Sequence, residues 1–124
     1  MENALLKSIL IVDDEQDLRE VLAEYLKDFG AEVHEAASGN QAWKILEEQH
    51  VDIIITDMRM PDGNGQEIIK KIHASQKLKN LPIIILSGYT DYSADELRNL
   101  GVSQFISKPV SLKKIKETVE KCLS

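Results

Sequence analysis

The sequence predicts an α/β fold in which helices cover both faces of a parallel sheet. Three short runs are apolar without alternation, at residues 9–12, 53–55 and 83–86. Their length and β-branched content are typical of strands that are buried on both faces. The segments between these runs carry apolar residues at helical spacing, so strands and helices should alternate along the chain.

Two further strand candidates are mixed in composition, which suits the edges of a sheet. Residues 33–36 alternate loosely, and residues 104–107 are half polar. If the three apolar runs are central, the strand order is 2-1-3-4-5, with right-handed crossovers. The predicted fold is therefore a flavodoxin-like (βα)5 doubly wound three-layer sandwich.

Five helices are expected between and after these strands. The first has one continuous apolar stripe that stops at Gly30, and Ser38 and Ser111 can cap the second and fifth helices. The lysines after residue 112 are interpreted as a solvated helix face. The apolar positions, helix by helix, are Leu18, Val21, Leu22, Tyr25, Leu26 and Phe29; Ala42, Ile45 and Leu46; Ile68, Ile69 and Ile72; Ala94, Leu97 and Leu100; and Leu112, Ile115, Val119 and Cys122.

Length and composition favour a single domain, residues 1–124, of an ordinary soluble kind. The chain is 43% hydrophobic and 29% charged, and its net charge of −6 argues against nonspecific binding to nucleic acid or acidic membranes. Cys122 is the single cysteine, so no internal disulfide can form and a cytoplasmic location is expected. No apolar run is long enough for a membrane helix, and the first residues lack a signal-peptide pattern.

Polar residues follow four of the expected strands directly. Asp13 and Asp14 follow the first, Asp57 ends the third, Ser87 ends the fourth and Lys108 follows the fifth. In open α/β sheets, ligands bind beyond the carboxyl ends of the strands, at the point where the strand order reverses. These five side chains should therefore converge on one small depression.

The combination of three acids, a hydroxyl and an ammonium indicates phosphoryl chemistry. Clustered carboxylates repel one another unless some are protonated or a cation joins them, and Mg²⁺ suits such a site, with Mn²⁺ as a possible substitute. Asp57 can then remain anionic and attack phosphorus to form an acyl phosphate. Lys108 and the Ser87 hydroxyl would stabilise the charge on the phosphoryl oxygens.

Four segments together resemble the receiver domain of two-component response regulators, in particular the single-domain chemotaxis regulators. They are residues 9–15, the run Asp57 to Pro61 with Gly65, the pair Ser87-Gly88, and residues 105–109. The resemblance covers the whole chain, in order and at the expected separations. It implies a signalling phosphoacceptor in a two-component system or phosphorelay, in which phosphorylation shifts the surface of helix 4, strand 5 and helix 5.

The resemblance also implies a role for each matching residue. Asp57 would be the phosphoacceptor. The Mg²⁺ ligands would be Asp13, Asp14, Asp57 and the main-chain carbonyl of Arg59. The switch and phosphoryl-binding residues would be Ser87, Phe105 and Lys108. Pro61, Gly65 and Pro109 would be structural, with a cis bond between Lys108 and Pro109.

Two bulky residues adjoin the expected site. Arg59 lies two residues after Asp57, and Tyr89 lies two residues after Ser87. Both side chains would overhang the acyl phosphate and obstruct the water that hydrolyses it. The hypothesis is that Arg59 and Tyr89 lengthen the phosphorylated lifetime.

The expected partners are a histidine kinase or histidine phosphotransfer protein, and a downstream protein target or fused output domain. No direct contact with nucleic acid or membrane is expected, and a homodimer is possible. The chain would be a complete regulator or a receiver from a longer protein. Three alternatives remain. An aspartyl-intermediate phosphatase is disfavoured because Arg59 stands where a second acid is needed, and a nucleotide or flavin binder is disfavoured because no glycine-rich phosphate motif is present. The third alternative is a phosphate-independent receiver relic.

Overall fold

The computed structural model describes residues 7–58, 65–87 and 94–123. Strands and helices alternate throughout this part of the chain, and none of its helices combines the length and apolar character that crossing a membrane requires. The strands are β1 (Ser8–Val12), β2 (Glu32–Ala36), β3 (Ile53–Asp57), β4 (Ile83–Ser87) and β5 (Gln104–Ser107). The helices are α1 (Gln16–Lys27), α2 (Gly39–Glu48), α3 (Gly65–Ala74), α4 (Ala94–Asn99) and α5 (Leu112–Leu123).

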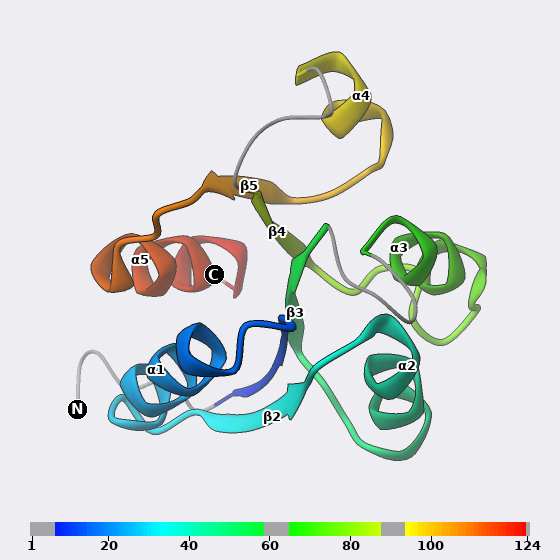
Figure 1. The fold of residues 1–124 in the computed structure, drawn as a ribbon. Coiled ribbons are helices and arrows are strands. Elements are labelled where there is room, and N and C mark those ends of the chain that lie inside the picture. The colour runs from blue at the N-terminus through cyan, green and yellow to red at the C-terminus, as the bar shows by residue number, and fades with distance from the viewer. Residues whose placement is uncertain (1–6, 59–64, 88–93, 124) are drawn as a thin grey trace.

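The five strands form one parallel sheet in the order β2-β1-β3-β4-β5, which confirms the predicted topology (Figure 1). β1, β3 and β4 are the central strands, and the residues of β1 and β3 are all buried. β2 and β5 are the edges, where half of the residues or more retain solvent contact. The apolar and mixed runs therefore mark central and edge strands, because only central strands are covered on both faces.

Two apolar cores lie on opposite faces of the sheet. The core on the α2 and α3 face includes Leu10 and Ile54, and the core on the α1 and α5 face includes Ile9 and Ile55 (Figure 1). Neighbouring strand residues thus enter different cores, because successive side chains of a strand point to opposite faces. The sheet is the middle of three layers.

The predicted helix caps are confirmed. The Ser38 hydroxyl accepts a hydrogen bond from the backbone N–H of Gln41, and the Ser111 hydroxyl accepts one from that of Lys114. α1 ends at Lys27, and Gly30 follows it with a φ of +92°, a left-handed conformation that glycine adopts without a steric penalty.

Two side chains lie where the periodicity did not predict them. Val21 belongs to the apolar stripe of α1 but is 50% exposed. Lys116 was expected on a solvated face of α5, yet it is 8% exposed, with its ammonium 4.2 Å from the centroid of the Phe29 ring and 3.2 Å from Glu120 Oε1. A lysine can be buried in this way because its aliphatic stem packs while its charge meets a ring face and a carboxylate.

Asp52 fixes the start of β1 at the edge of the sheet opposite to the carboxyl ends. Its Oδ2 accepts a hydrogen bond from the backbone N–H of Ser8 at 2.8 Å, and its Oδ1 lies 2.8 Å from Nε2 of His50. The Ser8 hydroxyl also donates to the carbonyl of His50 at 2.8 Å. The hydrogen bond from Ser8, together with His50, lowers the pKa of Asp52 below its ordinary value of 3.8, although partial burial opposes the shift.

The lowered pKa of Asp52 predicts an acid-dependent contribution to stability. A depressed carboxyl pKa stabilises the folded state above pH 3.8, and this contribution disappears as the pH falls through the lower pKa of the folded state. In urea unfolding between pH 2.5 and 7, Asp52→Asn should be less stable than the wild type near neutrality and should converge with it at the acid end. A difference that does not change with pH would contradict this role of the carboxylate.

Candidate functional site

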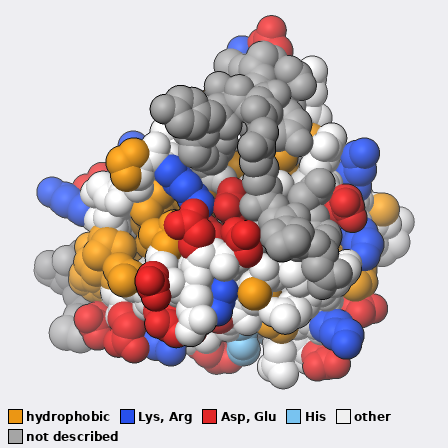
Figure 2. All heavy atoms as spheres, in the orientation of Figure 1, with side chains coloured by type: hydrophobic (Ala, Val, Ile, Leu, Met, Phe, Trp, Pro, Cys, Tyr) orange, Lys and Arg blue, Asp and Glu red, His pale blue; other side chains and the backbone are white. Residues whose placement is uncertain are grey.

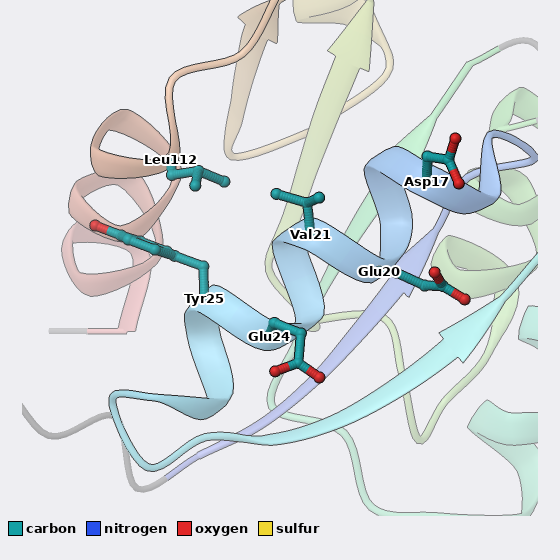
Figure 3. Close-up of a pocket in the computed structure, with 6 residues that line it drawn as sticks. All are labelled: Asp17, Glu20, Val21, Glu24, Tyr25 and Leu112. Carbon is teal, nitrogen blue, oxygen red and sulfur yellow. The ribbon is translucent and has the colours of Figure 1, made fainter.

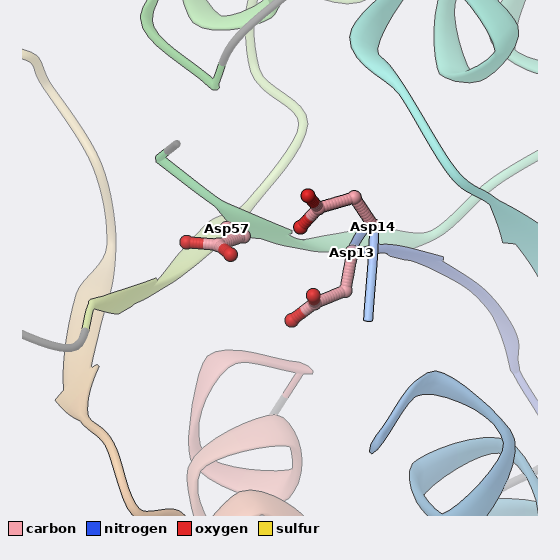
Figure 4. A group of neighbouring side chains, drawn as sticks. All are labelled: Asp13, Asp14 and Asp57. Atoms are coloured by element: carbon pink, nitrogen blue, oxygen red, sulfur yellow. The ribbon is translucent and has the colours of Figure 1, made fainter. Parts of the chain in front are cut away.

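Three carboxylates meet at the carboxyl edge of the sheet. Asp13 and Asp14 directly follow β1, and Asp57 is the last residue of β3, the strand beside it. Oxygen atoms of the three side chains lie within 4.8 Å of one another, and Figure 4 shows the three residues at the neighbouring ends of the two strands. Asp13 and Asp57 are buried and Asp14 is exposed, so the group opens to solvent on the side of Asp14.

Lys108 joins this acidic group from the end of β5. Its ammonium nitrogen lies 3.1 Å from Asp57 Oδ2, 3.1 Å from Glu15 Oε1 and 3.2 Å from Asp13 Oδ2. The peptide bond from Lys108 to Pro109 is cis, as the resemblance implies. Figure 2 shows acidic side chains gathered near the centre of the face drawn there, with a basic side chain beside them. Sequence reasoning assigned no role to Glu15, because an acid beside two other acids gives no separate signal.

Burial and charge act in opposition on the ionisable groups of this cluster. Burial raises the pKa of Asp13 above its ordinary value, although a hydrogen bond from the backbone N–H of Glu15 and the charge of Lys108 oppose the rise. Burial alone would lower the pKa of Lys108, but hydrogen bonds to Asp57 and Glu15 and the charges of Asp57 and Asp13 raise it. The ammonium therefore stays protonated, and Asp13 is the most fully buried acid of the cluster.

Arg19 and the backbone hold the first acidic residue in place. Asp13 Oδ1 accepts a hydrogen bond from the N–H of Glu15 at 2.9 Å, and the Asp13 carbonyl accepts one from Arg19 Nη1 at 2.7 Å. Arg19 is itself paired with Glu35 of β2 at 3.2 Å. Sequence reasoning missed Arg19, which lies on the first helix and carries no motif.

Gly65, at the start of α3, lies directly against the backbone of Asp57. Its N–H donates to the carbonyl of Met58 at 3.1 Å. A Cβ atom on Gly65 would collide with the carbonyl oxygen of Asp57 and would lie 2.9 Å from Cα of Met58. Both neighbours are backbone atoms that cannot rotate away, so this position accepts only glycine without a shift of the chain.

The other residues that sequence reasoning selected are only partly described. Phe105 of β5 is 43% exposed. Ser87 is the last residue of β4 and pairs in register with Ser107, but its side chain lies outside what the structure describes. Arg59, Pro61 and Tyr89 fall outside the described residues.

The acidic group has the donor chemistry of a site for a hard divalent cation. Asp13 Oδ2 is buried and, among the residues described, accepts no hydrogen bond of good geometry, although Lys108 lies near it. Mg²⁺ is a hard cation that takes oxygen ligands, usually one or two carboxylates together with waters and phosphate oxygens. The three acids could therefore bind a metal ion.

A second surface feature is a shallow groove between α1 and α5 (Figure 3). Its apolar part is formed by Val21 and Tyr25 of α1 and Leu112 of α5. Three acidic residues of α1 complete the lining, namely Asp17, Glu20 and Glu24. α1 begins two residues after Asp14, so one end of this groove adjoins the acidic cluster.

Comparison with known proteins agrees with the fold and shows the family. Residues 9–120 match the response regulator receiver domain family. A chemotaxis protein CheY homolog of Campylobacter jejuni is 34% identical over 120 residues, which cover 93% of this chain and 91% of that protein. The polar-differentiation response regulator DivK of Brucella ovis is 28% identical over 118 residues, with 94% and 96% covered.

Solved structures show the same likeness. A response regulator receiver protein from Pseudomonas putida superimposes with a TM-score of 0.86 at 38% identity, covering 95% of this chain and 98% of that one. The chemotaxis response regulator CheY4 of Vibrio cholerae gives a TM-score of 0.87 at 29% identity, covering 96% and 100%.

The contact between Gly65 and Asp57 predicts the effect of a single methyl group. At an exposed position inside a helix, Gly→Ala usually stabilises the folded protein. Here the methyl group would meet backbone atoms, so Gly65→Ala should lower the free energy of unfolding by about 1–3 kcal/mol. Urea unfolding measures the change, and NMR shifts should move at Asp57 and Met58. Lys70→Ala, an exposed change on the same helix, is the control and should have little effect. A stability of Gly65→Ala equal to that of the wild type would contradict the packing argument.

Proposed function

Because this chain belongs to the response regulator receiver family, we propose that Asp57 accepts a phosphoryl group from a phosphohistidine in a Mg²⁺-dependent reaction. The observation that carries this proposal is that the Asp57 carboxylate is grouped with Asp13 and Asp14 and contacts the Lys108 ammonium at 3.1 Å. The functional unit would be a single receiver domain, residues 1–124. The donor would be a histidine kinase or phosphotransfer protein, and the output a downstream protein or fused domain.

In the proposed reaction an Asp57 oxygen bonds to phosphorus while the N–P bond of the phosphohistidine breaks, and the electron pair of that bond stays on the imidazole. Asp13, Asp14 and Asp57 would hold Mg²⁺, together with the main-chain carbonyl of Arg59 by resemblance. When bound, the ion would neutralise charge on the phosphoryl oxygens. Lys108 would stabilise the charge on another phosphoryl oxygen. Its ammonium lies 3.1 Å from Asp57, the residue that would carry the phosphoryl group.

The remaining assignments stay predictions. The Ser87 hydroxyl would turn toward the phosphoryl group, and Phe105 would follow it inward from its present, partly exposed position. Phosphorylation would then shift the balance between two pre-existing conformations, and this shift would change the α4–β5–α5 surface. Arg59 and Tyr89 would set the phosphorylated lifetime.

The rival proposal is a receiver relic that binds partners without phosphorylation. The two proposals agree on fold and surface and differ in whether Asp57 reacts. An aspartyl-intermediate phosphatase is a weaker rival, because Arg59 stands where its general acid is needed.

Reaction with a small phosphodonor separates these proposals. Incubation with acetyl phosphate and Mg²⁺ should add one phosphoryl mass to the intact chain, because the reaction needs only the site itself. The adduct should be lost in Asp57→Asn, in Asp14→Ala and in EDTA, whereas Asp17→Asn, an exposed acid nearby, should retain it. Intact mass spectrometry measures the adduct. An unmodified wild type under conditions where a known receiver reacts would favour the relic.

We propose further that the groove between α1 and α5 docks the phosphodonor. Its apolar part suits apolar side chains of a helix, and Asp17, Glu20 and Glu24 favour basic residues beside them. The groove adjoins the acidic cluster, so a histidine on the docked helix could approach Asp57. Val21, which is 50% exposed, would become buried in this complex, which gives its exposure a function.

A charge in the groove should separate docking from chemistry. Val21→Lys should slow transfer from a histidine phosphotransfer protein that phosphorylates the wild type, by about tenfold or more, because an apolar contact is lost and like charges meet. Its reaction with acetyl phosphate should be unchanged. Gln49→Lys, an exposed change of the same charge at the end of α2, should affect neither donor. Equal slowing with both donors would place the effect in the chemistry and exclude docking at this groove.

A further inference from the structure

Glu15 is an acidic neighbour of the site that the proposed chemistry does not use. Its carboxylate is 62% exposed and contributes no oxygen to the group formed by Asp13, Asp14 and Asp57. Glu15 is also the residue that precedes α1, and within the described residues its side chain does not cap the helix. The carboxylate instead lies 3.1 Å from the Lys108 ammonium, with hydrogen-bonding geometry.

Hydrogen bonds fix the backbone of Glu15 on both sides, so the residue is held in position for its contact with Lys108. Its N–H donates to Asp13 Oδ1 at 2.9 Å, and its carbonyl accepts from the N–H of Arg19 at 3.0 Å. Lys108 is mostly buried, with 16% of its side chain exposed. A hydrogen bond to a partly desolvated ammonium is stronger than an ordinary surface ion pair, which contributes little.

The position of Lys108 conflicts with metal binding. Its ammonium lies 3.2 Å from Asp13 Oδ2 and 3.1 Å from Asp57 Oδ2, which are oxygens of two proposed metal ligands. A divalent cation on these carboxylates would repel the ammonium and weaken its contacts with them. Of its three described partners, Glu15 is the one outside the metal group, so it can keep the ammonium paired when those contacts weaken.

We propose that Glu15 is a positioning residue that holds Lys108 when a metal ion occupies the acidic group, and so favours metal binding. The inference rests on the proposed function, because it requires Mg²⁺ at Asp13, Asp14 and Asp57. It adds a second anchor for Lys108, outside the group of metal ligands. Without that anchor the ammonium loses a charge-assisted hydrogen bond or stays on the metal ligands, and either outcome weakens Mg²⁺ binding.

The test is the dissociation constant of Mg²⁺, measured by isothermal titration calorimetry on the full chain without any phosphodonor. Glu15→Gln should weaken binding by about tenfold, the lower end of the size expected from losing one hydrogen bond to a charged group. Glu15→Asp should behave like Glu15→Gln, because its shorter side chain keeps the charge but retreats from Lys108. Glu117→Gln removes an exposed charge on α5 and should leave the constant almost unchanged.

A double-mutant cycle with Lys108→Met shows whether Glu15 acts through Lys108. Lys108→Met alone should tighten Mg²⁺ binding, and adding Glu15→Gln to it should then have little further effect. A full effect of Glu15→Gln in the Lys108→Met background, or wild-type affinity in both Glu15 variants, would overturn the inference. If the wild type binds no Mg²⁺ at all, the metal site of the proposed function fails; if it binds and only the Glu15 predictions fail, that site stands.

Discussion

The charge balance at the carboxyl edge of the sheet is the constraint on which the site depends. A parallel sheet brings the ends of β1, β3 and β5 together, and these ends carry Asp13, Asp57 and Lys108. The carboxylates would repel one another in a partly buried place, but the ammonium of Lys108 contacts both. Arg19 and Glu15 extend this arrangement outward, to β2 and to solvent. A metal ion would enter a cluster that already holds one cation.

The two cores explain why this cluster can be rigid. The central strands are buried on both faces, between α1 and α5 on one side and α2 and α3 on the other. Their carboxyl ends are therefore fixed by packing, and the side chains at these ends are held in well-defined positions. Gly65 adds a backbone contact that sets the distance between α3 and Asp57.

The sequence was sufficient for the strand order and for the residues that gather at the edge, since both follow from apolar runs and from what comes after each strand. It was insufficient for contacts between elements that periodicity does not encode. Val21 continues the stripe of α1 but stays 50% exposed, whereas Lys116 is buried because its charge meets the face of the Phe29 ring. Glu15 was missed because an acid that follows two other acids gives no separate signal, although its partner Lys108 was expected at the same edge.

Gly65 also bears on how such a sequence can vary. Position 65 has no room for a side chain because the backbone of Asp57 fills the space, so its identity is fixed by the fold whatever protein donates or receives the signal. Val21 is 50% exposed, and in the proposed complex the phosphodonor would restrain its exposed part. In a set of related chains, substitutions at position 21 should therefore follow changes of partner, whereas position 65 should stay glycine when partners change.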